Sequence, residues 1–362
     1  MRLLMNKFRY LFFDFILKEW LLIASALGFV LTSIYTGNLP HYSIQELEVL
    51  FILFSLFVTV KGLENSGLIL RISQNIERGK AAPLKLVVAT FFLSMLITND
   101  AALIVIVPLT LAIKIKRMDV LVILEALAAN AGSALTPFGN PQNLFIYWFF
   151  GLTPAEFIAA IAPFSFIFFV LLVISSSFIK TNNSNQSSSK TATIEKSSYI
   201  YGILLIIALL TVLRLLPVSA GIVIILYALL FDRKSLRIDY ALLFVFFFFF
   251  GVAENLKIIL GSDIRHAGHI FLFSALASQI MSNVPAALLF AKFTIYWKAL
   301  LWGTNAGGFG SILGSLANLI AYKLYIANNS TNKQLSFTAK FLTFGYIAFF
   351  ISLGLYFVLN RV

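Results

Sequence analysis

The chain has 362 residues, of which 60% are apolar and only 12% are charged, so a soluble core cannot bury its apolar side chains. The lack of cysteine excludes disulfides, thiolate metal sites and cysteine nucleophiles, and three histidines argue against a zinc site. The net charge of +12 predicts no nucleic-acid partner, because in a membrane protein Lys and Arg mark the cytoplasmic loops.

We therefore expect an all-α polytopic membrane protein, whose first segment, residues 1–19, lies along the surface of the lipid bilayer. This segment carries Arg2, Lys7 and Arg9 before an apolar run that includes Asp14. It has no small-residue cleavage site, so we expect an interfacial amphipathic helix and not a removed signal peptide.

About nine hydrophobic stretches are long enough to cross the bilayer completely. They cover residues 20–37, 45–63, 118–150, 151–179, 199–215, 217–232, 239–257, 297–325 and 336–359. Two of them, 118–150 and 297–325, contain clusters of Asn, Gly, Ser and Thr, which a helix in hydrocarbon normally excludes. We expect these two spans to be broken helices.

Two further stretches, 84–113 and 266–295, each have a polar tip between apolar arms. The tips are Thr98-Asn99-Asp100 and Ser282-Asn283, and each arm has about a dozen residues. At 1.5 Å per residue such an arm crosses only part of a ~30 Å hydrocarbon core, so we expect two re-entrant helical hairpins. Two ordinary spans that contain polar residues are the alternative.

The two halves of the chain are related in sequence. A gapless alignment of residues 128–144 with 303–319 gives six identities in seventeen positions, most of them Asn or Gly. The first half, 20–179, is then one repeat. A Ser- and Asn-rich cytoplasmic linker, 180–198, leads to the second half, 199–362, which begins with an extra span.

Basic residues predict how these elements cross the membrane. If the first hairpin enters from the cytoplasm and the second from outside, 21 of the 27 Lys and Arg residues lie inside. The N-terminus is then cytoplasmic, the C-terminus is external, and the protein lies in the plasma membrane of a prokaryote. The two repeats are inverted, and inverted repeats with broken helices are typical of secondary transporters.

The breaks suggest how a solute is held. Pro137 and Pro141 remove backbone donors, and the half-helix after Pro141 points its free N–H groups at the membrane midplane, where they can bind an anion. In the second break, glycines such as Gly307 and Gly314 expose carbonyls that can ligate Na⁺. We expect no fixed cation near this site.

Four sequence motifs resemble the ion transporter superfamily of divalent anion/sodium symporters, arsenite permeases and D-type Na⁺/H⁺ antiporters, which share a citrate-transporter-like domain. They cover residues 96–103, 130–143, 282–286 and 314–318. The resemblance implies two hairpin tips that meet two unwound helices, a homodimer and an elevator-like movement. Asp100 and Val284 stand where the symporters have threonine, and Asn99-Asp100 is similar to the arsenite permease branch.

We expect the solute and the ions to contact the two tips and the two breaks. The residues are Thr98, Asn99, Asp100, Asn130, Gly132, Thr136, Pro137, Gly139, Asn140, Pro141, Asn143, Ser282, Asn283, Asn305, Gly307, Ser311, Gly314, Ser315 and Asn318. Asp100 and Glu125 are the candidates for proton coupling, although Asp100 can equally cap a helix. The second hairpin supplies no acidic counterpart to Asp100.

These observations predict a secondary transporter of a small anion or oxyanion, of the dicarboxylate, inorganic anion or arsenite type, coupled to Na⁺ or H⁺. No other cofactor is expected. A Na⁺/H⁺ antiporter that exchanges cations at Asp100 is the main alternative. A channel is a more remote alternative. So is an intramembrane enzyme that uses Asp100 with Glu125, because neither a paired aspartate motif nor a hydrolase motif occurs.

Overall fold

A computed structural model describes residues 19–76, 81–113, 115–180, 197–261, 264, 266–328 and 334–360. Within these ranges the chain is helical and has no β-strand, so the predicted all-α fold is confirmed. Apart from Glu19, the expected amphipathic helix lies outside the described residues. So does the expected linker, apart from its ends.

The described residues of the first half form eight helices in chain order. They are α2 (Trp20–Thr36), α3 (Ile44–Asn65), α4 (Leu68–Ile76), α5 (Ala82–Leu96), α6 (Asn99–Ala112), α7 (Met118–Ser133), α8 (Pro141–Phe149) and α9 (Pro154–Ser177). Local signals fix their starts: Ser43 and Thr153 each form a capping box with the Glu three residues later, at the beginnings of α3 and α9.

The second half continues with eight more α-helices and two short 3₁₀ segments. They are α10 (Ser197–Val212), η1 (Val218–Ala220), α11 (Gly221–Phe231), η2 (Arg233–Leu236), α12 (Tyr240–Leu260), α13 (Ala267–Met281), α14 (Asn283–Ala291), α15 (Trp297–Gly307), α16 (Leu316–Asn328) and α17 (Gln334–Asn360). The interruptions between α7 and α8 and between α15 and α16 fall in the two spans expected to be broken.

Three helices, α9, α12 and α17, are long and apolar enough to cross a bilayer by themselves, and six shorter helices are also apolar. Large apolar side chains such as Phe166, Ile203 and Phe350 remain exposed on the outside of the bundle. Together with the composition, these features identify a multi-pass membrane protein whose outer surface faces lipid.

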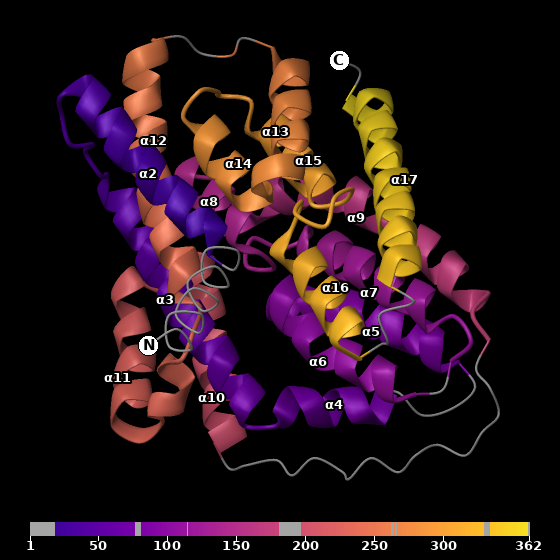
Figure 1. Cartoon of the computed structure of the whole chain (residues 1–362). Coiled ribbons are helices and arrows are strands. Elements are labelled where there is room, and N and C mark those ends of the chain that lie inside the picture. The colour runs from indigo at the N-terminus through magenta and orange to yellow at the C-terminus, as the bar shows by residue number, and fades with distance from the viewer. Residues whose placement is uncertain are drawn as a thin grey trace, which may run out of the picture.

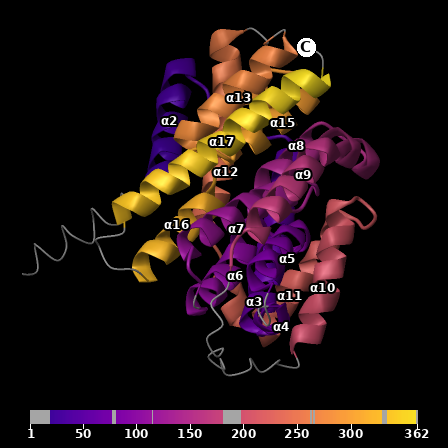
Figure 2. The ribbon, with the colours of Figure 1, turned by 90° about the vertical axis from the view of Figure 1, so that its right-hand side faces the viewer.

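The two hairpins enter the bundle from opposite ends (Figure 1). The pair α5 and α6 lies in the lower part of the view and turns at Thr98, whereas α13 and α14 lie in the upper part and turn at Ser282. The broken helices pass between them, and Figure 2 shows α17 slanting across this face beside α16 and α15. An inverted relation between the halves stays a prediction, which this placement supports.

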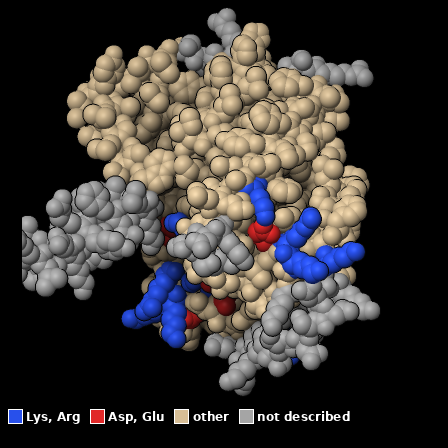
Figure 3. Space-filling model, turned by 45° about the vertical axis from the view of Figure 1, so that its right-hand side comes forward, with Lys and Arg blue, Asp and Glu red and all other residues tan. Residues whose placement is uncertain are grey.

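Charged side chains are unevenly spread over the surface. On the face in Figure 3, the Lys, Arg, Asp and Glu residues of the described chain lie in the lower half, and the upper part is free of them. This lower end also holds the ends of α4 and α10 in Figure 1. The distribution supports a cytoplasmic lower end, as the positive-inside rule predicts.

The centre of the bundle is closely packed because α7 is lined by small residues. Ala126, Ala128, Ala129 and Ala131 are all buried completely. Small side chains let helix backbones approach each other in membranes, and α7 packs closely against α5 and α6. The hairpin is thereby held against the broken helix.

Candidate functional site

The first break is held open by an asparagine that replaces missing backbone hydrogen bonds. The side-chain amide of Asn143 donates to the carbonyls of Ser133 at 3.2 Å and Thr136 at 3.4 Å. Asn140 then caps α8 by accepting the backbone N–H of Asn143, and Pro141 occupies the first helical turn. The loop is therefore a defined structure whose carbonyls are satisfied inside the membrane protein.

The second break is built in the same way. The side-chain amide of Asn318 donates to the carbonyls of Gly308 at 2.9 Å and Ser311 at 3.0 Å. These acceptors stand at the positions that the gapless alignment pairs with Ser133 and Thr136. The two breaks thus repeat one set of contacts.

Two asparagine pairs join the breaks to each other. Asn130 donates to the side-chain oxygen of Asn318, and Asn305 donates to that of Asn143, both at 2.8 Å. All four side chains are buried. The asparagine before each break therefore bonds the asparagine after the other break, so neither half can form this centre alone.

The hairpin tips dock onto the breaks through their backbones. The N–H of Asn99 donates to the carbonyl of Gly139 at 3.1 Å, and the N–H of Asn283 donates to that of Gly314 at 3.0 Å. Thr98 caps α6, and Asn99 also donates from its side chain to Asn130 at 3.2 Å. Each tip is therefore fixed to the break of its own half.

Side chains and glycines bring the hairpin arms close to the same breaks. Thr136 donates its hydroxyl to the carbonyl of Met95 at 2.9 Å, and Ser311 does so to Gln279 at 2.8 Å. A Cβ at Gly132 would lie 2.2 Å from the carbonyl oxygen of Phe91. A side chain at this position would force the first hairpin away.

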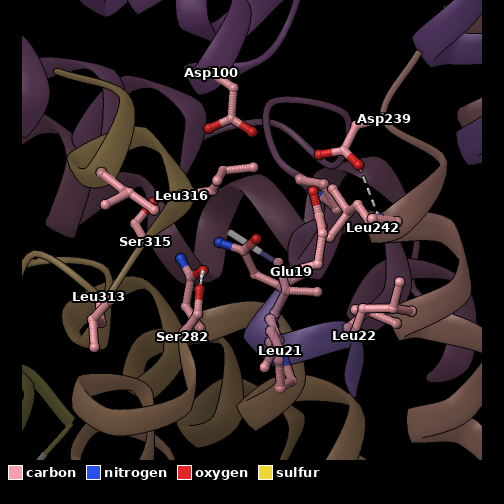
Figure 4. Close-up of a pocket in the computed structure, with 18 of the residues that line it drawn as sticks. Glu19, Leu21, Leu22, Asp100, Asp239, Leu242, Ser282, Leu313, Ser315 and Leu316 are labelled. Atoms are coloured by element: carbon pink, nitrogen blue, oxygen red, sulfur yellow. Dashed lines mark hydrogen bonds between the residues drawn. The ribbon is translucent and has the colours of Figure 1, made fainter. Parts of the chain in front are cut away.

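Four helix N-termini surround a pocket of about 190 Å³ between the tips, those of α6, α8, α14 and α16 (Figure 4). Its polar lining residues are Glu19, Asn99, Asp100, Gln142, Asp239, Ser282, Asn283, Ser315 and Lys323. The first turns of all four helices carry the positive end of the helix dipole, although caps and the neighbouring breaks already accept several of their N–H groups, among them those of Asn99, Asn143 and Asn283. The pocket is suited to hold negative charge.

Two buried polar atoms of this pocket have no partner among the described residues. One is the amide nitrogen of Gln142, a residue only 1% exposed, and the other is Oδ1 of Asp100. The first is a hydrogen-bond donor and the second is an acceptor. A bound anion would satisfy the amide, and a proton or another cation would satisfy the carboxylate.

The α8 helix carries a cation at its other end. Arg214, at the end of α10, donates to the carbonyls of Tyr147 and Trp148 at 3.3 and 3.1 Å, and its guanidinium lies over both rings. Arg214 has a φ of +60°, an unusual conformation for a residue other than glycine. A positive charge there neutralises the negative end of the helix whose positive end faces the pocket.

The predicted site residues divide into three groups. Those that line the pocket are Asn99, Asp100, Pro141, Ser282, Asn283 and Ser315. Those that lie behind it, in caps, breaks and the asparagine network, are Thr98, Asn130, Gly132, Thr136, Pro137, Gly139, Asn140, Asn143, Asn305, Gly307, Ser311, Gly314 and Asn318. Glu125 stands apart.

Glu125 lies between α6 and α7, outside the lining of the pocket. Its side chain is completely buried, and one oxygen accepts the hydroxyl of Thr110 at 2.5 Å. The other oxygen has no partner among the described residues. Glu125 is therefore placed to act on the hairpin and not to touch a solute.

Sequence reasoning missed four polar or charged residues of the pocket: Gln142, Glu19, Asp239 and Lys323. The expectation of no nearby fixed cation is wrong, because Lys323, one to two turns into α16, lines the pocket. Gln142 directly follows Pro141, so its place in the first turn of α8 was a usable signal. Glu19, Asp239 and Lys323 line the pocket because of how their helices pack, which sequence patterns do not show.

The chain is similar to known membrane transporters over most of its length. The family described as citrate transporter matches residues 12–307. The uncharacterized transporter MJ0456 of Methanocaldococcus jannaschii is 35% identical over 299 residues, which cover 79% of this chain and 83% of the relative. The inner membrane protein YbiR of Escherichia coli is 36% identical over 290 residues, or 75% and 78% of the two chains. The silicon efflux transporter LSI3 of Oryza sativa is 31% identical over 129 residues, or 34% and 27%.

Proposed function

The chain belongs to the citrate transporter family, and we propose that it is a secondary active transporter of a small anion or oxyanion, coupled to Na⁺ or H⁺. The observation that carries this proposal is the amide donor of Gln142, which has no partner among the described residues and is buried in a pocket where four helix N-termini meet. A free donor beside four positive dipole ends favours a ligand that accepts hydrogen bonds and carries negative charge.

The size of the pocket narrows the solute. A volume of about 190 Å³ holds on the order of ten water molecules. A dicarboxylate, an inorganic anion or arsenite fits that space together with a few waters. One relative is named for silicon efflux, and silicon too is carried in water as a small oxyacid.

The arrangement of the tips supports alternating access. The pocket lies where the two hairpins approach each other from opposite ends, so a movement of the tips relative to α2 and α12 can open it to one side at a time. We propose that the N-terminus is cytoplasmic and that two copies associate in the membrane. The beginnings of α2 and α12 line the pocket, and this supports a mouth toward the proposed cytoplasmic side.

Transport into proteoliposomes tests the proposal. The purified protein is reconstituted, and uptake of labelled succinate, citrate, sulfate and arsenite is followed under imposed Na⁺ or H⁺ gradients. We expect gradient-driven accumulation of at least one solute above protein-free vesicles. If none of the four is accumulated, exchanged or extruded, the proposal is overturned.

A Na⁺/H⁺ antiporter is the second candidate, favoured by the carboxylates of Asp100 and Asp239 in the pocket. Such a protein would dissipate a preformed pH gradient when Na⁺ is added in the absence of any anion substrate. Fluorescent dyes that report the internal pH of the vesicles distinguish the two functions. The buried donor of Gln142, for which a cation has no use, favours the anion transporter.

A further inference from the structure

Two carboxylates stand at different depths of the pocket. Asp100 is the second residue of α6, and its Oδ1 atom is completely buried. Asp239 is exposed and caps α12 by accepting the N–H of Leu242 at 3.1 Å. Figure 4 shows both carboxylates along one side of the pocket.

The pocket carries more acidic than basic side chains. Besides Asp100 and Asp239 it contains Glu19 at the start of α2, whereas the cation is Lys323 of α16. The lining residues from α8 and α14 include no charged side chain. Among the described lining residues three carboxylates stand against one ammonium, so an anion held by the helix N-termini meets net negative charge from them unless a carboxylate is protonated.

The two unpartnered atoms leave room for both ligands at the same time. Gln142 offers a buried donor to an anion, and Asp100 Oδ1 offers a buried acceptor to a proton. A proton on Asp100 removes repulsion from the anion, and the anion in turn makes protonation more favourable. Each ligand strengthens the binding of the other.

We propose that Asp100 carries the coupling proton, that Asp239 passes it between Asp100 and water at the mouth of the pocket, and that proton and anion travel together as symport. The inference rests on the proposed function, because it needs an anion in the same pocket. The proton comes from water on the side from which the solute enters and returns to water on the other side, so no further reactant is needed.

Asp239 suits a relay for two structural reasons. It is exposed, whereas Asp100 Oδ1 is buried, and it caps α12, whereas Asp100 belongs to the tip of the first hairpin. A movement of the tip away from α12 would separate the pair and isolate the proton on Asp100. Proton exchange is thereby limited to one state of the transport cycle.

The test combines equilibrium and rate measurements on the full chain. Binding of the solute that exchanges fastest among succinate, citrate, sulfate and arsenite is measured in detergent between pH 5 and pH 9. For one linked proton we expect the affinity to fall about tenfold per pH unit in the alkaline range. Proton uptake on addition of the solute to weakly buffered protein should approach about one per chain.

Three variants separate the roles. Asp100→Asn should make solute binding independent of pH and abolish proton uptake on addition of the solute. Asp239→Asn keeps the cap of α12, because asparagine also accepts the N–H of Leu242, and it should slow proton-driven uptake about tenfold or more while equilibrium proton uptake remains. Glu64→Gln removes a carboxylate outside the pocket and should resemble the wild type.

The outcomes are distinguishable. The proton proposal is overturned if solute exchange occurs but binding is independent of pH in the wild type, or if Na⁺ cannot be replaced by choline. A normal rate of proton-driven uptake in Asp239→Asn overturns the relay. If no solute of the panel exchanges at all, the proposed function itself fails and this inference fails with it.

Discussion

The side chain of Asn305 donates a hydrogen bond of 2.8 Å to the side chain of Asn143, across 162 residues of sequence. Its counterpart, from Asn130 to Asn318, has the same length. Each donor lies in the last turn of the helix before one break, and each acceptor lies in the first turn of the half-helix after the other break. The geometry of the pocket therefore depends on both halves at once, and a substitution in one half should change the structure of the other.

Replacing Asn143 by leucine should destabilise the whole centre. The substitution removes the hydrogen bond from Asn305 and those to the carbonyls of Ser133 and Thr136, at a cost of roughly 1–3 kcal/mol for each buried group that is left unsatisfied. We expect a lower free energy of unfolding in detergent and loss of solute binding. Asn328→Leu, at an exposed position, is the control, and equal behaviour of the two variants would contradict the network.

Gly132→Ala should impair transport through the position of the hairpin. The new Cβ would lie 2.2 Å from the carbonyl oxygen of Phe91, so α5 must move away from α7. We expect a loss of solute affinity of tenfold or more in a binding assay. Gly202→Ala in α10 meets no atom within 4 Å and should be neutral or stabilising by up to ~1 kcal/mol. Wild-type affinity in Gly132→Ala would disprove the close approach.

We expect Lys292 to stabilise the end of the second hairpin that lies away from its tip, after α14. Its ammonium lies 2.7 Å from Glu46 and 2.7 Å from Glu254, so it joins α14 to α3 and α12. Because Glu46 is only 1% exposed, Lys292→Met should lower the free energy of unfolding by about 3 kcal/mol. Lys61→Met breaks a more exposed pair and should cost less than ~1 kcal/mol in the same denaturant titration. Similar costs would argue against the cluster.

Arg214→Gln should weaken anion binding from a distance. The guanidinium contacts the last carbonyls of α8, whose N-terminus faces the pocket. Loss of the charge removes about 0.3–1 kcal/mol of helix-end stabilisation, so we expect about a two- to fivefold lower affinity. Isothermal titration calorimetry with the transported solute measures this affinity. Arg233→Gln, on an exposed arginine, should leave the affinity unchanged, and an identical effect would exclude the helix dipole as the cause.

Much of this architecture follows from sequence because hydrocarbon tolerates few polar residues. The two tips and both breaks can be recognised in the sequence because Asn, Ser and Gly residues interrupt apolar runs there. The alignment matched Asn130 with Asn305, yet the structure bonds Asn130 to Asn318. A gapless alignment shows which residues are equivalent, and it does not show which of them meet.

The charges of the pocket could not be predicted in the same way. The sequence predicts an acidic counterpart of Asp100 only in the second hairpin, which has none. In the structure, Asp239 lines the pocket from the beginning of α12. Lys323 and Glu19 likewise arrive from α16 and from the start of α2. Their positions depend on the packing of helices far apart in the chain, which hydropathy does not encode.

The central claim is that the pocket binds an anion through the amide of Gln142 and the surrounding helix ends. The most direct measurement is solute exchange in proteoliposomes by Gln142→Leu beside Gln45→Leu, whose glutamine is exposed on α3. Removal of the donor should reduce exchange by tenfold or more, because a hydrogen bond to a charged group contributes about 1.5–3 kcal/mol, whereas Gln45→Leu should exchange as the wild type does. Equal exchange by both variants would contradict the account.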